Sequence, residues 1–150
     1  LDHLETDRRI DRRRIGCAGL SGGGLQTLNL AAMDRRVKAA VVSGYFYGVK
    51  ESLLILNSNC VCNLVPHLWE SFDMGDIGAL VAPRGLFVET GSRDSLNGKS
   101  NLDNVRSQVR IAGKVFSAFG ARRNLVHHVF DGEHRWDGTR AIPWMQQVLE

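Results

Sequence analysis

No run of eighteen apolar residues occurs in this chain, so no membrane-spanning helix is expected. Cysteine is also scarce, because the chain has only Cys17, Cys60 and Cys62, and three thiols cannot all pair with one another. The short Cys60-Val61-Cys62 spacing has no second cysteine pair that would complete a zinc site. We therefore interpret all three cysteines as structural, Cys17 as a small core residue, and we expect neither a metal nor a cofactor.

Charge of one sign does not dominate the chain, whose formal net charge is +3. One short segment nevertheless holds five of the basic residues, namely Arg8, Arg9, Arg12, Arg13 and Arg14. Two aspartates interrupt this segment, and it lacks aromatic residues on which bases could stack. We interpret it as a solvated helix end and turn, and expect neither a nucleic-acid nor a membrane partner.

An initiator methionine and a signal-type segment are also missing at the start, where the first residue is Leu1. We therefore expect a fragment or a processed product, and the compartment stays open. The 150 residues, 43% of them hydrophobic, suffice for the core of one domain that spans 1–150.

Strand and helix patterns alternate along the chain. Four short apolar runs predict strands, and three longer segments with helical spacing of apolar residues predict helices. Residues 1–9 are expected to end a helix, and 44–80 to form an irregular excursion with helical pieces. The strands are expected at 14–20, 37–43, 86–90 and 125–130, and the helices at 22–33, 105–119 and 142–149, the last opened by Pro143. This alternation predicts the α/β class, with a parallel sheet and helices on both faces.

The segment Gly19-Leu20-Ser21-Gly22-Gly23 has the G-x-S-x-G pattern of a nucleophile elbow. It follows an expected strand and leads into an expected helix, which is the context that this motif requires. A serine at such a turn adopts strained backbone angles, and we expect Gly19 and Gly23 to remove side chains that would collide there. Ser21 would then be exposed at a helix N-terminus, with the Gly22 amide available to a developing negative charge.

The same segment has two other interpretations. It could be a plain glycine-rich turn between a strand and a helix, or a loop that binds phosphate at a helix N-terminus. The loop does not end in Gly-Lys-Ser/Thr, and it does not match G-x-G-x-x-G, so neither nucleotide-binding fingerprint is present.

Two further candidate residues follow later strands. Asp94 comes after the expected strand 86–90, and His134 after the strand 125–130, so the chain order is Ser, acid, His, as in α/β-hydrolases. In parallel sheets ligands bind beyond the carboxyl ends of the strands, where these groups are expected to meet. We predict Ser21 as nucleophile, His134 as general base, Asp94 as the acid that orients the imidazole, and Gly22 as an oxyanion donor.

Each carboxylate also has a competing interpretation. Asp94 could be a turn or N-cap residue, because its neighbours favour caps. Asp73, Asp76 and Asp103 are competing acids, but none directly follows an expected strand. Glu133 is adjacent to His134, which makes the required carboxylate-to-ring geometry awkward.

The remaining histidines and aromatic residues receive structural interpretations first. We expect His127 and His128 to be sheet residues that face opposite sides, and His67 to be structural or to line the substrate site. Three aromatic residues, Trp69, Phe72 and Trp136, could line the pocket, although aromatic side chains more often belong to the core. Of these, we predict Trp136 as the substrate-binding residue.

With these residues identified, the chain resembles the C-terminal half of an α/β-hydrolase, most closely the esterases related to acetyl xylan esterase and dienelactone hydrolase. The segments that carry the resemblance are Arg-Ile-Gly-Cys-Ala-Gly-Leu-Ser-Gly-Gly-Gly at 14–24, Asp-Met-Gly-Asp-Ile-Gly-Ala-Leu-Val-Ala-Pro-Arg at 73–84, and His-His-Val-Phe-Asp-Gly-Glu-His-Arg-Trp at 127–136. The resemblance implies a serine esterase that acts through an acyl-enzyme, on a small-molecule or carbohydrate ester such as an acetyl ester.

Relatives of this kind carry several strands before the elbow, and a second oxyanion donor among them. Here only about twenty residues precede Ser21, so we expect a portion of a longer enzyme, or a missing half supplied by another chain, with a homo-oligomer as one alternative. A peptidase or thioesterase on the same fold, and a non-catalytic α/β domain or inactive fragment, remain alternative functions.

Overall fold

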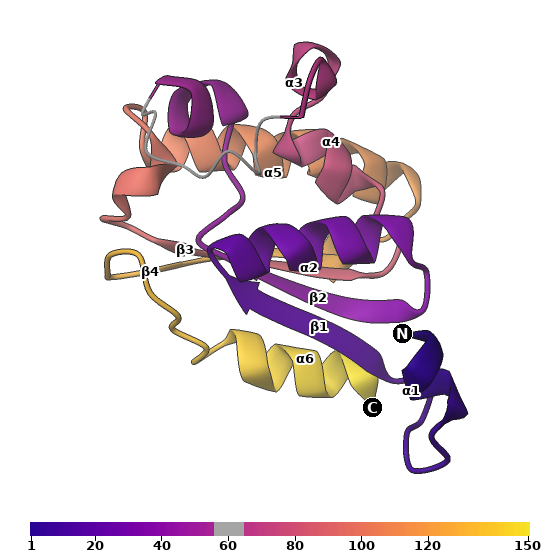
Figure 1. The fold of residues 1–150 in the computed structure, drawn as a ribbon. Coiled ribbons are helices and arrows are strands. Elements are labelled where there is room, and N and C mark those ends of the chain that lie inside the picture. Colours follow the sequence, from indigo (N-terminus) through magenta and orange to yellow (C-terminus); the bar gives the residue numbers. More distant parts are fainter. Residues whose placement is uncertain (56–64) are drawn as a thin grey trace.

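A parallel β-sheet of four strands forms the centre of the computed structural model, which describes residues 1–55 and 65–150 (Figure 1). The strands pair in sequence order, β1-β2-β3-β4, and all three pairings are parallel. Their bounds are β1 Ile15–Leu20, β2 Val37–Ser43, β3 Gly85–Gly91 and β4 Leu125–Phe130. The four strands expected from the sequence are confirmed.

Helices cover both faces of this sheet, as predicted, with α2, α4 and α5 above it in Figure 1 and α6 below. The α-helices are α1 Asp2–Thr6, α2 Gly22–Met33, α3 Leu68–Ser71, α4 Met74–Ala79, α5 Leu102–Ala118 and α6 Ala141–Leu149. A π-helical segment, η1, spans Lys50–Ile55, and two 3₁₀ turns are η3 Ser95–Asn97 and η4 Arg122–Asn124. In the part of the chain that the structure describes, no helix has the length and apolar character to cross a membrane.

Two helices begin earlier than the sequence pattern predicts. Helix α5 starts at Leu102 instead of 105, and Leu102, three residues before Val105, continues its apolar spacing. Helix α6 starts at Ala141, which places Pro143 inside the first turn and not at its opening. Proline is tolerated there, because the first N–H groups of a helix have no partner within it.

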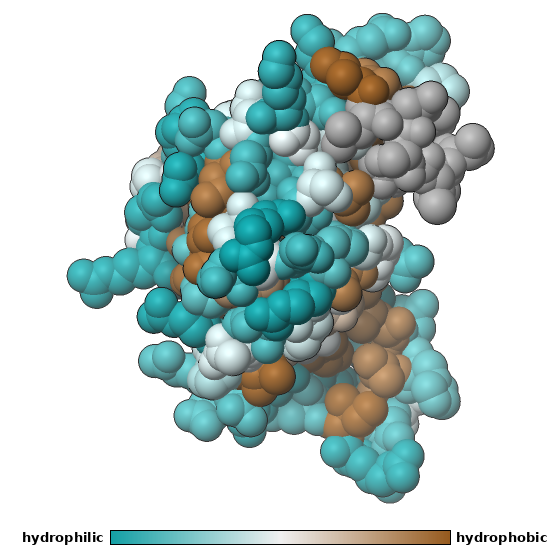
Figure 2. Space-filling model, turned by 90° about the vertical axis from the view of Figure 1, so that its left-hand side faces the viewer, coloured by the Kyte–Doolittle hydropathy of each residue, from teal (hydrophilic) through white to brown (hydrophobic). Residues whose placement is uncertain are grey.

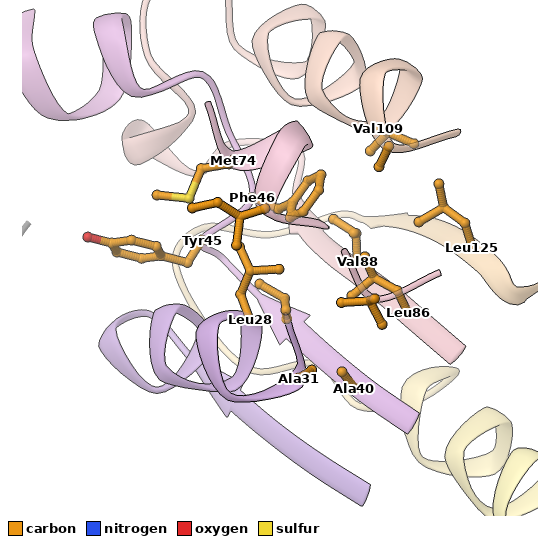
Figure 3. Packing of buried hydrophobic residues seen from close by; sticks show 14 of the residues in the cluster. Leu28, Ala31, Ala40, Tyr45, Phe46, Met74, Leu86, Val88, Val109 and Leu125 are labelled. Carbon is orange, nitrogen blue, oxygen red and sulfur yellow. The ribbon is translucent and has the colours of Figure 1, made fainter. Parts of the chain in front are cut away.

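The larger core lies between the sheet and the helices α2, α4 and α5 (Figure 3). Alternate strand residues point into it, among them Ala40 from β2 and Leu86 and Val88 from β3. On the other face a smaller cluster joins Val41 and Phe87 to α6. Helix α6 packs close to the sheet because β1 and β3 carry glycines where it contacts them. A Cβ at Gly85, for example, would lie 3.0 Å from the Trp144 ring.

Arg84 ties several elements together at the edge where the strands begin. One guanidinium nitrogen donates to the carbonyl oxygens of Asp34 and Val37, and the other to those of Ala31 and Leu80. These contacts satisfy carbonyls at the ends of α2 and α4, which otherwise have no helical partner.

The other expectations about single residues have mixed outcomes. Cys17 lies half-buried against the core at the edge strand, with its Sγ 3.3 Å from the Thr27 hydroxyl, so it is less buried than expected. Cys60 and Cys62 lie outside the described residues. In the arginine-rich segment, Arg9 and Arg13 form exposed ion pairs with Asp7 and Asp11.

Candidate active site

Ser21 stands at the turn between β1 and α2 with φ 57° and ψ −124°, a conformation that non-glycine residues rarely adopt. It occupies the N-cap position of α2, yet its side chain does not cap the helix. Its backbone N–H instead donates to the Ser43 carbonyl oxygen at the end of β2, at 2.9 Å. The turn therefore holds the backbone and leaves the hydroxyl unused by the helix, as an elbow requires.

The glycines around this turn differ in the space that each leaves for a side chain. A Cβ at Gly19 would lie 2.2 Å from the carbonyl carbon of Gly23, so only glycine fits there. The expectation that Gly23 also avoids a collision is wrong, because a Cβ at Gly23 would meet nothing within 4 Å. The second steric requirement falls on Gly24, whose Cβ would lie 2.9 Å from the Ser43 carbonyl oxygen. Gly22 is exposed, with open space around its Cβ position.

Asp94 and His134 are in direct contact. The distance between Asp94 Oδ2 and His134 Nδ1 is 2.7 Å, and the Asp94 side chain is 1% exposed while that of His134 is 30% exposed. The other oxygen, Oδ1, accepts the Leu96 N–H at 2.9 Å and caps the turn η3. Burial raises the pKa of Tyr47, and the charge of Asp94 adds a smaller contribution.

The loops that carry these two residues are joined through their backbones. Ser92 N–H donates to the Phe130 carbonyl oxygen at 2.9 Å, and Arg93 N–H to that of Gly132 at 2.8 Å. Gly91 permits this approach, because a Cβ there would lie 2.4 Å from the Glu133 carbonyl oxygen. The loop after β3 and the loop after β4 therefore act as one unit at the rim of the sheet.

The imidazole of His134 also lies close to the elbow. A Cβ at Gly44 would be 3.0 Å from His134 Cε1 and 3.3 Å from the side chain of Leu20, the residue before Ser21. Gly44 has φ +60° and directly follows Ser43, whose carbonyl holds the Ser21 backbone. Within the described residues no hydrogen bond joins the Ser21 hydroxyl to His134. Catalytic hydrogen bonds are often long or misaligned in a site without substrate.

The competing acids are occupied elsewhere. Asp73 caps α4 in a capping box with Asp76, and it also accepts from the Val49 N–H and from Gln108 Nε2. Asp103 forms an exposed pair with its helix neighbour Arg106. Glu133 is exposed. The structure brings none of these carboxylates to the His134 ring.

The two histidines of β4 face opposite sides of the sheet, which confirms that expectation. His127 lies on the α5 side, 3.2 Å from the Thr90 hydroxyl, and burial, aided by the charge of Arg106, lowers its pKa to about 4. His128 lies on the α6 side, near Phe87, with its Nε2 3.7 Å from Asp137 Oδ2.

The remaining residues that we considered as lining the pocket lie in separate places. Trp136 packs against the smaller cluster between the sheet and α6, so its contact with substrate stays a prediction. Trp69 packs against the larger core, and Phe72 is exposed. His67 is an exposed residue paired with Glu70. The residues that the structure describes include no cluster of three or more histidine, cysteine or acidic side chains that would hold a metal ion.

The sequence analysis missed Glu89, a glutamate of β3 whose exposed fraction is zero. It accepts hydrogen bonds from the Ser43 hydroxyl and from the backbone N–H groups of Asp137 and Gly138. One feature of the sequence could have pointed to it: a lone charge inside the otherwise apolar run 86–90.

Known proteins share this architecture. A crystal structure described as a putative acetyl xylan esterase from Bacteroides fragilis superposes with a TM-score of 0.79 at 17% identity, covering 99% of this chain and 46% of the other. A glucuronoyl esterase from Solibacter usitatus gives a TM-score of 0.76 at 20% identity, covering 98% of this chain and 44% of that one. The chain therefore has the α/β-hydrolase fold of these esterases and spans just under half of their length.

A sequence relative agrees with the structural neighbours. The Bacillus subtilis protein named "Putative hydrolase YtaP" is 29% identical over 111 residues, which cover 73% of this chain and 37% of that protein. No family model matches the chain.

Proposed function

We propose that this chain carries the catalytic residues of a serine esterase, with Ser21 as nucleophile, His134 as general base and Asp94 as the orienting acid. The observation that carries the proposal is the 2.7 Å contact between the buried Asp94 carboxylate and His134 Nδ1 beside the strained elbow of Ser21. A carboxylate on Nδ1 leaves Nε2 as the nitrogen that takes a proton, and it stabilises the imidazolium that forms.

The reaction runs in two halves. The Ser21 hydroxyl attacks the ester carbonyl carbon while His134 takes its proton, and the oxygen of the tetrahedral intermediate becomes negative. His134 then gives the proton to the leaving alcohol, and the acyl group stays on Ser21. A water molecule, activated in the same way, releases the carboxylic acid and restores the hydroxyl. The Gly22 N–H at the start of α2 is the oxyanion donor that this chain offers.

The comparisons support carboxylic esters as the substrate class. The structural neighbours are described as a putative acetyl xylan esterase and as glucuronoyl esterases, one of which is described as a carbohydrate esterase. We propose an ester of a carbohydrate as the substrate, with an acetyl ester as the first to test.

One edge strand of the described sheet, β1, is suited to pairing with further strands. Strand β1 is an edge of the described sheet, and its sequence, Ile-Gly-Cys-Ala-Gly-Leu, carries no charge. Edge strands with free backbone groups tend to pair with another strand. We propose that further strands, from the same polypeptide or from another chain, extend the sheet beside β1 and supply the second oxyanion donor.

Hydrolysis of a small aryl acetate by Ser21→Ala tests this function. We expect kcat to fall by at least about 10³-fold, because no acyl-enzyme forms without the hydroxyl. Ser92→Ala, at the same rim but bound to Asp131, is the matched control and should retain activity. Equal activity of the wild type and Ser21→Ala would contradict the proposal. Thioester and peptide substrates, measured in parallel, separate the esterase from the thioesterase and peptidase alternatives.

A further inference from the structure

We infer that Glu89 is a positioning residue, whose buried carboxylate fixes the loop that carries His134 relative to the strand end that holds Ser21. The inference rests on the proposed function and extends it to a residue that does not touch substrate. Glu89 lies on β3 with no exposed surface, on the same face as α6.

The carboxylate has three donors, all from other elements. Its Oε1 accepts from the Ser43 hydroxyl at 2.9 Å and from the Asp137 N–H at 3.1 Å, and its Oε2 accepts from the Gly138 N–H at 2.9 Å. A buried carboxylate is costly unless it is hydrogen-bonded, and here each oxygen has a partner. Removal of one acceptor would leave a buried N–H group unsatisfied.

These three bonds connect the two parts of the proposed catalytic site. Asp137 and Gly138 follow His134 by three and four residues, so they fix the end of its loop. Ser43 ends β2, and its carbonyl oxygen accepts the Ser21 N–H. The Glu89 backbone adds a fourth tie, because its carbonyl oxygen accepts the N–H of Gly44, against which the imidazole packs.

The other side-chain ties of this loop do not replace Glu89, and the backbone bond from Arg93 N–H to the Gly132 carbonyl oxygen fixes only the part of the loop before His134. The pairing of Arg93 with Asp131 is exposed, and exposed ion pairs stabilise little. His128 approaches Asp137 only to 3.7 Å. Glu89 is also not the orienting acid, since Asp94 contacts Nδ1 of His134.

Glu89→Gln tests the inference in the full chain. A glutamine side chain has one acceptor oxygen and one NH₂ donor, so one of the two loop amides loses its acceptor. Misplacement of a catalytic group by about 1 Å can cost about 10²-fold in rate. We expect kcat to fall by about 10- to 100-fold, KM to stay within about twofold, and labelling by a fluorophosphonate to slow by the same factor as kcat.

One variant serves as the control, measured where circular dichroism shows it folded. Asp73→Asn disturbs another carboxylate that binds backbone amides, in the cap of α4, and should lower the melting temperature without lowering kcat. Ser43→Ala removes the bond between the carboxylate and the end of β2, and should lower kcat by less than Glu89→Gln does, because the backbone bond from Gly44 N–H to the Glu89 carbonyl oxygen remains. Glu89→Asp keeps the charge with a shorter reach and should also lose kcat, which provides a second variant if Glu89→Gln does not fold.

The outcomes separate the two proposals. Unchanged kcat in folded Glu89→Gln or Glu89→Asp, or a loss no larger than that of Asp73→Asn, would overturn the positioning role alone. A wild type whose Ser21 reacts with neither ester nor fluorophosphonate would overturn the proposed function, and the positioning role with it. A loss confined to kcat, with KM kept, supports the inference.

Discussion

At the scale of single residues, Asp94 combines a turn cap with the contact to His134 that its proposed catalytic role requires. One carboxylate oxygen caps the turn η3 and the other contacts His134. The cap fixes the orientation of the carboxylate before the imidazole binds to it. A residue that caps a turn can therefore also serve a catalytic site, because a carboxylate has two oxygens with several acceptor positions.

His127 is the residue whose burial makes stability depend on pH. Its pKa is lowered from 6.5 to about 4, so the unfolded chain binds a proton that the folded chain does not between these two values. Stability is therefore complete above about pH 6.5 and is lost as the pH falls towards 4. His127→Gln, which cannot titrate, should remove this part of the pH dependence, of about 2–3 kcal/mol, in urea unfolding at pH 7.5 and pH 4.5.

The comparison between the two pH values is the internal control for this variant. Relative to wild type, His127→Gln should have a less favourable unfolding free energy at pH 7.5 than at pH 4.5, because only the wild type loses stability as the pH falls. An identical difference at both values would show that His127 titrates alike in the folded and unfolded chain.

At the scale of elements, Arg84 joins the ends of α2 and α4 to the start of β2, at the opposite edge of the sheet from the candidate site. Burial lowers the pKa of its guanidinium, which stays charged because arginine pKa values are so high. Four carbonyl oxygens accept from this one side chain, three of them at the ends of α2 and α4, so Arg84 helps to cap both helices.

Arg84→Met should destabilise the chain by about 2–4 kcal/mol, because it leaves these carbonyls without their charged donor. Urea unfolding measures the change. Arg35→Met, at a nearby exposed position, is the matched control and should stay within about 0.5 kcal/mol of wild type. The kcat of folded Arg84→Met should equal that of wild type; a specific loss of kcat would show that this edge also shapes the site.

The elements that the sequence predicted well are those whose pattern is local. The strands β2 and β4 have the expected bounds, because each is an apolar run closed by turn residues. The start of α5 was missed because two polar residues, Asp103 and Asn104, separate Leu102 from the rest of the apolar pattern. Glu89 was missed for a different reason: its role depends on Ser43 and on Gly138, which are distant in sequence, and no local pattern indicates such contacts.

At the scale of the whole molecule, the parallel sheet explains why these groups meet. All four strands run in one direction, so the elbow after β1 and the loops after β3 and β4 share one rim (Figure 1). Figure 2 looks onto this side of the molecule, where hydrophilic residues predominate and apolar residues form smaller patches. The sequence could predict this convergence because strand direction follows from the alternation of strands and helices.

The steric details of the rim could not be predicted in the same way. Gly44 and Gly91 are required because distant loops pack against them, the first under the His134 ring and the second under the backbone of the same loop. Such requirements appear only once the loops are placed in space. The motif alone pointed to Gly23, whereas the packing places the requirement on Gly24.

The central claim is that Ser21 is a nucleophile activated at this rim. Its most direct measurement is intact mass spectrometry after reaction with a fluorophosphonate, followed by peptide mapping of the adduct. We expect one adduct per chain, located on Ser21, absent in Ser21→Ala and formed much more slowly in Asp94→Asn. A folded wild type that carries no adduct, or carries it on another residue, would contradict the claim.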